Sequence, residues 1–289
     1  MTTIKRFLSI LLLFFLFHSC SVFDPPGQIP SYIHIDSIGL TANYTTDGTA
    51  SHKITDAWVY VDQVLNGVYA MPATIPILAS GVHEIDVHPG ILVDGIQATR
   101  ESYPFYTFYS NNYNLTTQQI TTINPTVTYY PGIVPTWYED FENPGLSVQT
   151  VAPNQDTIVK AMTNVFEGHS SGYIALSNPS NYYFECNTIL EYPLPTDGSR
   201  SVYLEMNYMS TNTIRIGVLP IDPTNSYTYI DDTVLEINPS LTWNKIYIDL
   251  TSVCGSYPGS SFRIFIAALL DPGLNNAQIY IDNLKLLHQ

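Results

Sequence analysis

The sequence predicts an all-β protein with two β-sandwich domains in series, and three observations support this prediction. Tyrosine and proline are abundant, with 22 and 20 residues, whereas charged residues make up only 12% of the chain, a composition typical of all-β extracellular modules. Apolar and polar residues alternate in many short runs, as they do in half-buried strands. Turn pairs such as Asp197-Gly198 and Pro272-Gly273 separate these runs.

The first nineteen residues have the parts of a secretory signal peptide. Lys5 and Arg6 precede an apolar run from Phe7 to Phe17, and the small residue Ser19 lies just before Cys20. A membrane-spanning helix needs about 20 apolar residues, so this run is too short to be an anchor. We therefore expect residues 1–19 to be a leader that directs secretion.

The end of this leader resembles a bacterial lipoprotein signal, in which a cysteine after a small residue is acylated. The resemblance implies that Cys20 carries acyl chains such as palmitate and anchors the protein in a membrane. Ser21 rather than Asp follows Cys20, which in Gram-negative lipoproteins implies the outer membrane, on its periplasmic or its cell-surface face. Residues 20–31 contain several prolines and are expected to form a tether.

The strong excess of acidic residues excludes some partners. The chain has 10 basic and 25 acidic residues, a net charge of −15, and loss of Lys5 and Arg6 with the leader makes the balance more negative still. Nucleic acid and anionic lipid head groups would be repelled. We expect a solvated acidic surface and no nucleic-acid partner.

Two cysteines remain besides Cys20. Cys186 and Cys254 could form a disulfide in an oxidising compartment, or they could be two separate buried thiols. Their spacing does not match a metal-binding cysteine motif.

Residues 32–130 are predicted to form a small β-sandwich domain. Residues 57–61 alternate as in a half-buried strand, and Asn66-Gly67 directly after them predicts the hairpin turn. Residues 71–78 contain two prolines and are expected to be an edge strand or a connection rather than a central strand. Residues 82–87 alternate again, and Pro89-Gly90 is expected to end that strand.

The order of these motifs from Asp56 to Gly90 resembles the small PEGA-like and transthyretin-like β-sandwiches of bacterial surfaces. The resemblance implies a spacer or a binding sandwich for this domain and no enzymatic activity.

After a predicted linker at residues 131–136, residues 137–289 read as a succession of strands. Residues 202–208, 214–218 and 262–268 all alternate with period two. About nine or ten strands in this length predict a sandwich of two sheets.

Four motifs in this second domain, in this order, resemble the galactose-binding-like jelly roll found in many carbohydrate-binding modules. They are Asp140-Phe141-Glu142, Gly168 to Leu176, Thr242 to Thr251 and Ile279 to Leu286. The resemblance implies a jelly-roll fold for residues 137–289 and a carbohydrate as one class of ligand.

The last predicted strand changes register within itself. Ile279 and Ile281 share one face, whereas Leu284 and Leu286 have the opposite parity, so we expect a β-bulge at Asp282. In the resembling modules, acidic residues of the first and last strands hold a structural calcium. The resemblance therefore implies Glu142 and Asp282 as calcium ligands; the alternative is a bulge closed by its own hydrogen bonds.

The sequence favours a non-catalytic structural or protein-interaction role at the cell envelope, with glycan binding as the alternative. For glycan binding, aromatic residues in loop-flanked stretches are the candidates, namely Tyr182, Tyr183, Tyr227 and Tyr229. We expect no enzyme, because the paired carboxylates of residues 139–142 and 231–232 have no demonstrated cleft, and no serine-hydrolase elbow or zinc-protease motif occurs.

Overall fold

The computed structural model describes residues 27–151, 157–222 and 232–289. Cys20 and the predicted leader lie outside these residues, so the lipid anchor stays a prediction. No helix in the described part is both long and apolar enough to cross a membrane.

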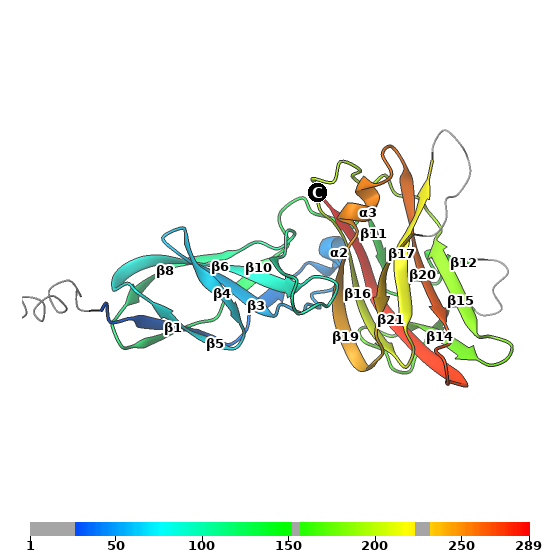
Figure 1. The fold of residues 1–289 in the computed structure, drawn as a ribbon, viewed down its shortest axis with the longest axis horizontal. Helices are drawn as coiled ribbons and strands as arrows, with labels where there is room; N and C mark the ends of the chain where they lie inside the picture. Colours follow the sequence, from blue (N-terminus) through cyan, green and yellow to red (C-terminus); the bar gives the residue numbers. More distant parts are fainter. Residues whose placement is uncertain (1–26, 152–156, 223–231) are drawn as a thin grey trace, which may run out of the picture.

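The N-terminal part of the described chain is built from three small sheets that share one core (Figure 1). The largest sheet contains β4 (Val64–Ala70), β3 (Asp56–Val61), β6 (Gly81–Leu92), β7 (Arg100–Ser102) and β8 (Tyr109–Leu115). The second contains β5 (Ala73–Ile77), β1 (Ser31–Ile35) and β9 (Ile120–Ile123), and the third pairs β2 (Gly39–Thr41) with β10 (Thr126–Thr128). A short helix, α2 (Tyr44–Asp47), follows β2.

The predicted alternation of residues 57–61 is confirmed in β3, but the predicted hairpin turn is wrong. Asp62 and Gln63 form the turn, with φ of 49° and 67°, as a tight hairpin connection requires at its two central residues. Asn66 lies inside β4, where Val59 pairs with Gly67 and Tyr60 pairs with Leu65. Asn66 is therefore the extra residue of a β-bulge.

The strand expected to end at Pro89-Gly90 continues to Leu92. β6 pairs with β8 up to Val87 and with β7 from Gly90 onward. Pro89 lies at the change of partner, where its missing N–H interrupts neither ladder. The edge position expected for residues 71–78 is confirmed, because β5 is an outer strand of its sheet.

The C-terminal part is a sandwich of two sheets around a single core, which confirms the predicted all-β fold class. The six-stranded sheet contains β13 (Val159–Ala161), β14 (Ser171–Ser177), β21 (Asn276–His288), β16 (Val202–Ser210) and β19 (Ser240–Asp249), and β11 (Trp137–Glu139) also pairs with β21. The five-stranded sheet contains β12 (Val148–Thr150), β15 (Tyr183–Thr188), β20 (Ser261–Leu269), β17 (Ile214–Ile221) and β18 (Asp232–Ile237). A short helix, α3 (Thr251–Gly255), follows β19.

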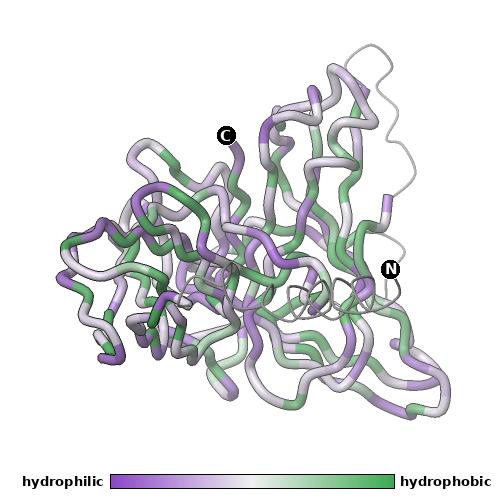
Figure 2. Tube along the Cα trace, turned by 60° about the vertical axis from the view of Figure 1, so that its left-hand side comes forward, coloured by the Kyte–Doolittle hydropathy of each residue, from purple (hydrophilic) through white to green (hydrophobic). Residues whose placement is uncertain are grey.

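The apolar faces predicted for this part are the faces that pack between the two sheets. Even-numbered residues from Val202 to Tyr208 in β16 and from Phe262 to Ala268 in β20 belong to the core. Figure 2 shows apolar and polar residues interleaved along the chain in this way. The predicted bulge in β21 is confirmed, because Glu205 pairs with Lys285 whereas Asn207 pairs with Asp282, and Asn283 has a φ of 50°.

Cys186 and Cys254 are both buried free thiols, so the disulfide alternative is wrong and the buried-thiol alternative is confirmed. Both side chains belong to the core of the C-terminal sandwich. Burial raises the pKa of each thiol to about 12. They act as small apolar core residues.

The sheets separate near the predicted linker, but the packing is continuous across it. No described strand lies between β10 and β11. The N-terminal core nevertheless includes Tyr203, Tyr247 and Leu287 of the six-stranded sheet. The predicted domain boundaries remain a prediction. The two parts pack directly against each other.

Candidate functional site

The outer face of the six-stranded sheet, turned away from the sandwich core, is covered at one end and open at the other. At the covered end, Val93 forms an isolated bridge with Tyr247, and Tyr203 packs edge-to-face on Tyr103 with ring centroids 5.4 Å apart. We call this contact between the two parts the joint. The joint therefore covers one end of this outer face.

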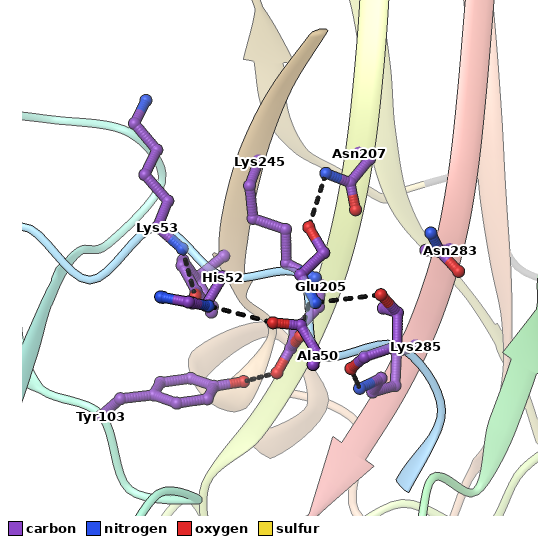
Figure 3. A network of polar contacts seen from close by, with 12 residues as sticks. Ala50, His52, Lys53, Tyr103, Glu205, Asn207, Lys245, Asn283 and Lys285 are labelled. Carbon is purple, nitrogen blue, oxygen red and sulfur yellow. Dashed lines mark hydrogen bonds and ion pairs between the residues drawn. The ribbon is translucent and has the colours of Figure 1, made fainter. Parts of the chain in front are cut away.

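A buried polar cluster holds the joint together (Figure 3). Glu205 on β16 is fully buried and accepts hydrogen bonds of 2.9 Å from the hydroxyls of Tyr103 and Tyr129. Lys245 Nζ lies 2.8 Å from Glu205 Oε2. Lys285 Nζ donates to the Tyr129 hydroxyl at 2.8 Å and to the Thr49 carbonyl at 3.0 Å. The cluster therefore joins the two parts by charge-assisted hydrogen bonds.

The charges of this cluster depend on one another. Burial acts to raise the pKa of Glu205, but the ammonium groups of Lys245 and Lys285 outweigh burial and hold that pKa below its usual range. Burial lowers the pKa of Lys285 to about 8, against the attraction of Glu205. Glu205 and Lys285 bind protein groups from both parts of the chain, so we assign the cluster a structural role. Lys245 Nζ is buried beside Glu205 as an ion pair and makes no hydrogen bond to a described residue.

The loop of residues 162–170 covers the middle of the same face. The Glu167 carboxylate accepts hydrogen bonds from the Thr49 hydroxyl and, at 3.1 Å, from Asn283 Nδ2. Phe166 packs edge-to-face on Trp243 with ring centroids 5.4 Å apart. The loop thus forms one wall of the open end of the sheet.

At the open end, a row of apolar side chains crosses four strands. Val159 pairs with Tyr173, Tyr173 pairs with Tyr280, and Tyr280 pairs with Met209. The rings of Tyr173 and Tyr280 lie 4.8 Å apart at an interplanar angle of 34°. Beside this row is a hollow of ≈ 180 Å³, which we call the distal groove. It is lined by Asn164, Met209, Ser210, Thr211, Leu241, Gln278 and Tyr280.

The period-two pattern of the strands aims these side chains outward. Ile174 and Leu176 face the core, so Tyr173 lies on the outer face. Ile279 and Ile281 face the core, so Tyr280 also lies on the outer face, where neighbouring groups leave 7% of it exposed. The same alternation could have identified both tyrosines from the sequence. Neither tyrosine is among the predicted glycan-binding residues, because those lie in loop-flanked stretches and these two lie inside strands.

Two exposed amides stand at the rim of the distal groove. The side chains of Asn164 and Gln278 make no hydrogen bond to another described residue. The backbone of Gln278 is fixed, because its N–H donates to the Thr211 hydroxyl at 2.9 Å. Each free amide offers both donors and an acceptor. Apolar rings with a few polar groups at their edge are the usual lining of a small-molecule site.

A larger hollow of ≈ 550 Å³ lies where α2 meets residues 128–134, and two of its side chains already bind groups of α2. Asn43 Oδ1 accepts from the Thr45 N–H at 3.0 Å, as a helix N-cap. The Asp47 carboxylate accepts from the Asn43 N–H at 2.8 Å and from the Thr46 hydroxyl at 2.9 Å. Asn43 Oδ1 and the Asp47 carboxylate are therefore occupied by protein donors.

Of the aromatic residues predicted for glycan binding, the two that the structure describes, Tyr182 and Tyr183, do not line the distal groove. Tyr182 is 51% exposed, and Tyr183 begins β15 in the five-stranded sheet, where its hydroxyl donates to Glu185. Tyr227 and Tyr229 lie outside the described residues. The groove residues come from the other sheet.

The predicted calcium ligands both contact residues 166–171, but through hydrogen-bond donors. Glu142 accepts from the N–H groups of His169 and Ser170 at 2.8 and 3.0 Å. Burial acts to raise the pKa of Glu142, and these bonds overcome it and lower that pKa. Asp282 accepts from the Ser171 hydroxyl at 2.6 Å.

Burial raises the pKa of Asp282 to about 7 despite that hydrogen bond. Among the residues that the structure describes, no group of three or more His, Cys, Asp or Glu side chains is placed to hold a metal ion. Calcium binding by Glu142 and Asp282 stays a prediction.

The described members of the paired carboxylates considered for catalysis accept hydrogen bonds from neighbouring protein groups. Glu139 is buried and accepts from the N–H groups of Phe141 at 2.8 Å and Ser147 at 2.6 Å. Asp232 accepts from the Tyr257 hydroxyl at 2.9 Å, and Asp231 lies outside the described residues. The contacts of Glu139 fix the backbone after β11.

Known structures similar to this chain include carbohydrate-binding modules with β-sandwich folds, whereas no protein-family model and no curated protein matches it. The C-terminal family 22 carbohydrate-binding module of a Clostridium thermocellum protein shares 14% identity over 53% of this chain and 93% of its own, with a TM-score of 0.38. A family 11 module from Clostridium thermocellum, in complex with a β-1,3-1,4-mixed-linked tetrasaccharide, shares 14% identity over 51% of this chain and 92% of its own, with a TM-score of 0.38.

A third structure, of carbohydrate-binding modules of promiscuous specificity from the β-sandwich superfamily, shares 14% identity over 91% of this chain and 100% of its own, with a TM-score of 0.39. Similarity at this level leaves the function to be argued from the geometry of this chain's own site.

Proposed function

We propose that this protein is a lipid-anchored, non-catalytic glycan-binding protein and that the distal groove holds the glycan. One observation carries the proposal: Tyr280 lines the distal groove together with the uncommitted amides of Asn164 and Gln278, and its ring lies 4.8 Å from the ring of Tyr173 on the neighbouring strand. A sugar has apolar C–H groups and a rim of hydroxyls. An aromatic ring can pack against the C–H groups, and an amide beside it can form hydrogen bonds with the hydroxyls.

The size of the groove and the net charge of the protein narrow the class of glycan that could bind. A hollow of ≈ 180 Å³ is below the usual range of about 300–1,000 Å³ for drug-sized ligands, so it suits a single sugar ring of a longer chain. The net charge of −15 disfavours acidic polysaccharides. We therefore propose a neutral glycan that lies across the strands.

The membrane anchor at Cys20 and the absence of catalysis belong to the same proposal. A lipid at Cys20 would keep the groove at an outer-membrane surface, where glycans of the cell or its surroundings are within reach. The purely structural role favoured by the sequence needs no free amides or outward rings. Their presence together favours ligand binding over that role.

A glycan array with the chain from Ser21 onward, which keeps every described residue, would test the proposal. We expect binding to one class of neutral glycan and unchanged glycan after long incubation. Binding to no glycan, or release of shorter sugars, would contradict the proposal.

A further inference from the structure

The end of the N-terminal part that lies farthest from the joint carries exposed aliphatic side chains; we call it the tip. Their exposed fractions are 57% for Ile29, 70% for Val64, 64% for Leu78, 70% for Val82 and 61% for Ile120. Scattered apolar residues are normal on a protein surface, but a group at one place usually marks a contact.

Hydrogen bonds bring these residues to one end of the molecule. His83 Nδ1 lies 2.7 Å from Asp62 Oδ2 and its Nε2 lies 3.2 Å from the Ser80 carbonyl, which joins the β3–β4 and β5–β6 turns. The Ser31 hydroxyl donates to the Ala79 carbonyl at 2.8 Å. The Gln118 N–H donates to the Pro30 carbonyl at 2.9 Å. Three turns and the first described residues thus meet at the tip.

The tip and the joint lie at opposite ends of β6. This strand starts at Gly81 and ends at Leu92, directly before Val93 bridges Tyr247. At about 3.3 Å per residue, the strand separates the two ends by roughly 36 Å. Figure 1 shows the start of β1 at the far end from the C-terminal sandwich.

The chain before the tip is too short to hold it far from a lipid on Cys20. Only residues 21–28 separate Cys20 from Ile29. Fully extended, they span roughly 30 Å. A bilayer that holds the acyl chains is therefore within reach of the tip.

The charges of the tip decide which kind of membrane contact it suits. Its charged groups are Asp62, His83 and Glu84, and the tip segments contain no lysine or arginine. Attraction to anionic lipids depends on basic clusters, so it cannot operate here. Aliphatic side chains enter the interfacial layer by burial of apolar surface instead.

We propose that the tip is a membrane-contacting surface that rests on the zwitterionic phospholipid layer in which Cys20 is anchored. This inference rests on the lipid anchor of the proposed function and is independent of glycan binding. The contact would orient the molecule and hold the joint about one strand length from the bilayer.

The experiment supplies the anchor artificially, so that its outcome does not depend on acylation of Cys20. The chain from Ser21 receives an N-terminal hexahistidine segment and is tethered to phosphatidylcholine vesicles containing a nickel-chelating lipid. An environment-sensitive dye is attached to Val82→Cys; Cys186 and Cys254 are buried, so we expect them not to react with the dye in the folded protein. The same dye on Leu190→Cys, 65% exposed in the wild-type residue and located in the C-terminal sandwich, is the matched control.

On tethering, we expect the emission of the dye at position 82 to shift to shorter wavelength and its quenching by an aqueous quencher to become severalfold slower. The emission and quenching of the dye at position 190 should not change. The triple variant Val64→Ser, Leu78→Ser and Ile120→Ser should lose the shift while its unfolding curve stays the same, because all three side chains are exposed. An unchanged dye at position 82, or an equal shift at position 190, overturns the proposal. A shift that appears without vesicles as protein concentration rises also overturns it, because a second copy would then cover the tip.

Discussion

The Tyr129 hydroxyl donates to Glu205 across the joint, at 2.9 Å from Oε1 and 3.1 Å from Oε2. These residues are 76 positions apart; Tyr129 directly follows β10 in an isolated bridge with Tyr106, whereas Glu205 lies in β16. The same hydroxyl accepts a hydrogen bond from Lys285. One buried anion therefore holds tyrosines of the N-terminal part and lysines of the C-terminal sheet in a single arrangement.

Glu205→Ala should be strongly destabilising. Without the carboxylate, Lys245 and Lys285 lose their buried counter-ion, and removal of one partner from a buried ion pair costs about 3–5 kcal/mol. Glu236→Ala is the matched control, because its pair with Arg215 is exposed and such pairs contribute about 1 kcal/mol or less. Urea unfolding of the three proteins measures the difference. Equal losses of stability would show that the cluster does not support the joint.

Lys285 should make stability depend on alkaline pH. Its pKa is lowered by burial from 10.5 to about 8, so the folded state disfavours its charged form. This cost is present in full below pH 8 and is relieved as pH rises toward 10.5, so the contribution of Lys285 to stability rises in that window.

The comparison that isolates this effect is wild type against Lys285→Met. From about pH 7.5 to about pH 9.5, the unfolding free energy of the wild type should gain roughly 2 kcal/mol on that of the variant. Burial raises the pKa of Tyr103 and Tyr106 well above the usual value, which lowers stability toward pH 10 in both proteins alike. If the difference in unfolding free energy between the two proteins stayed constant over this pH range, it would contradict a lowered pKa of Lys285 in the folded state.

The two core thiols should be unreactive in the native protein and free in the unfolded one. Burial raises the pKa of Cys186 and Cys254 to about 12, so almost no thiolate is present near pH 8. We expect no reaction with a thiol reagent in buffer, and two alkylated cysteines in denaturant without reductant in a chain that starts at Ser21. Failure to alkylate them without reductant would reveal a disulfide.

Local patterns in the sequence predicted much of the fold, because alternation is a property of one strand at a time. The core faces of β3, β16 and β20 and the bulge in β21 follow from such patterns. The hairpin turn was misplaced because Asn66-Gly67 is a strong turn signal, whereas Asp62 is fixed by contacts with His83 and Glu84 from a distant strand.

The joint and the distal groove could not be predicted in the same way. Glu205 is an outward residue of β16, and only the packing of Tyr103 and Tyr129 over it buries it. The rings of Tyr173 and Tyr280 meet beside the groove because the two residues occupy the same register on neighbouring strands, 107 residues apart along the chain. Neither relationship is visible in a short window of sequence.

The affinity of groove variants for the glycan that the array identifies tests the central claim most directly. Isothermal titration would compare wild type with Tyr173→Ala, Gln278→Ala and the control Tyr182→Ala, an exposed tyrosine outside the groove. Loss of a ring contact or an amide hydrogen bond, each about 1 kcal/mol, should weaken binding about fivefold per variant. Tyr182→Ala should bind as wild type does. Unchanged affinity in both groove variants, or an equal loss in Tyr182→Ala, would contradict a glycan site in the distal groove.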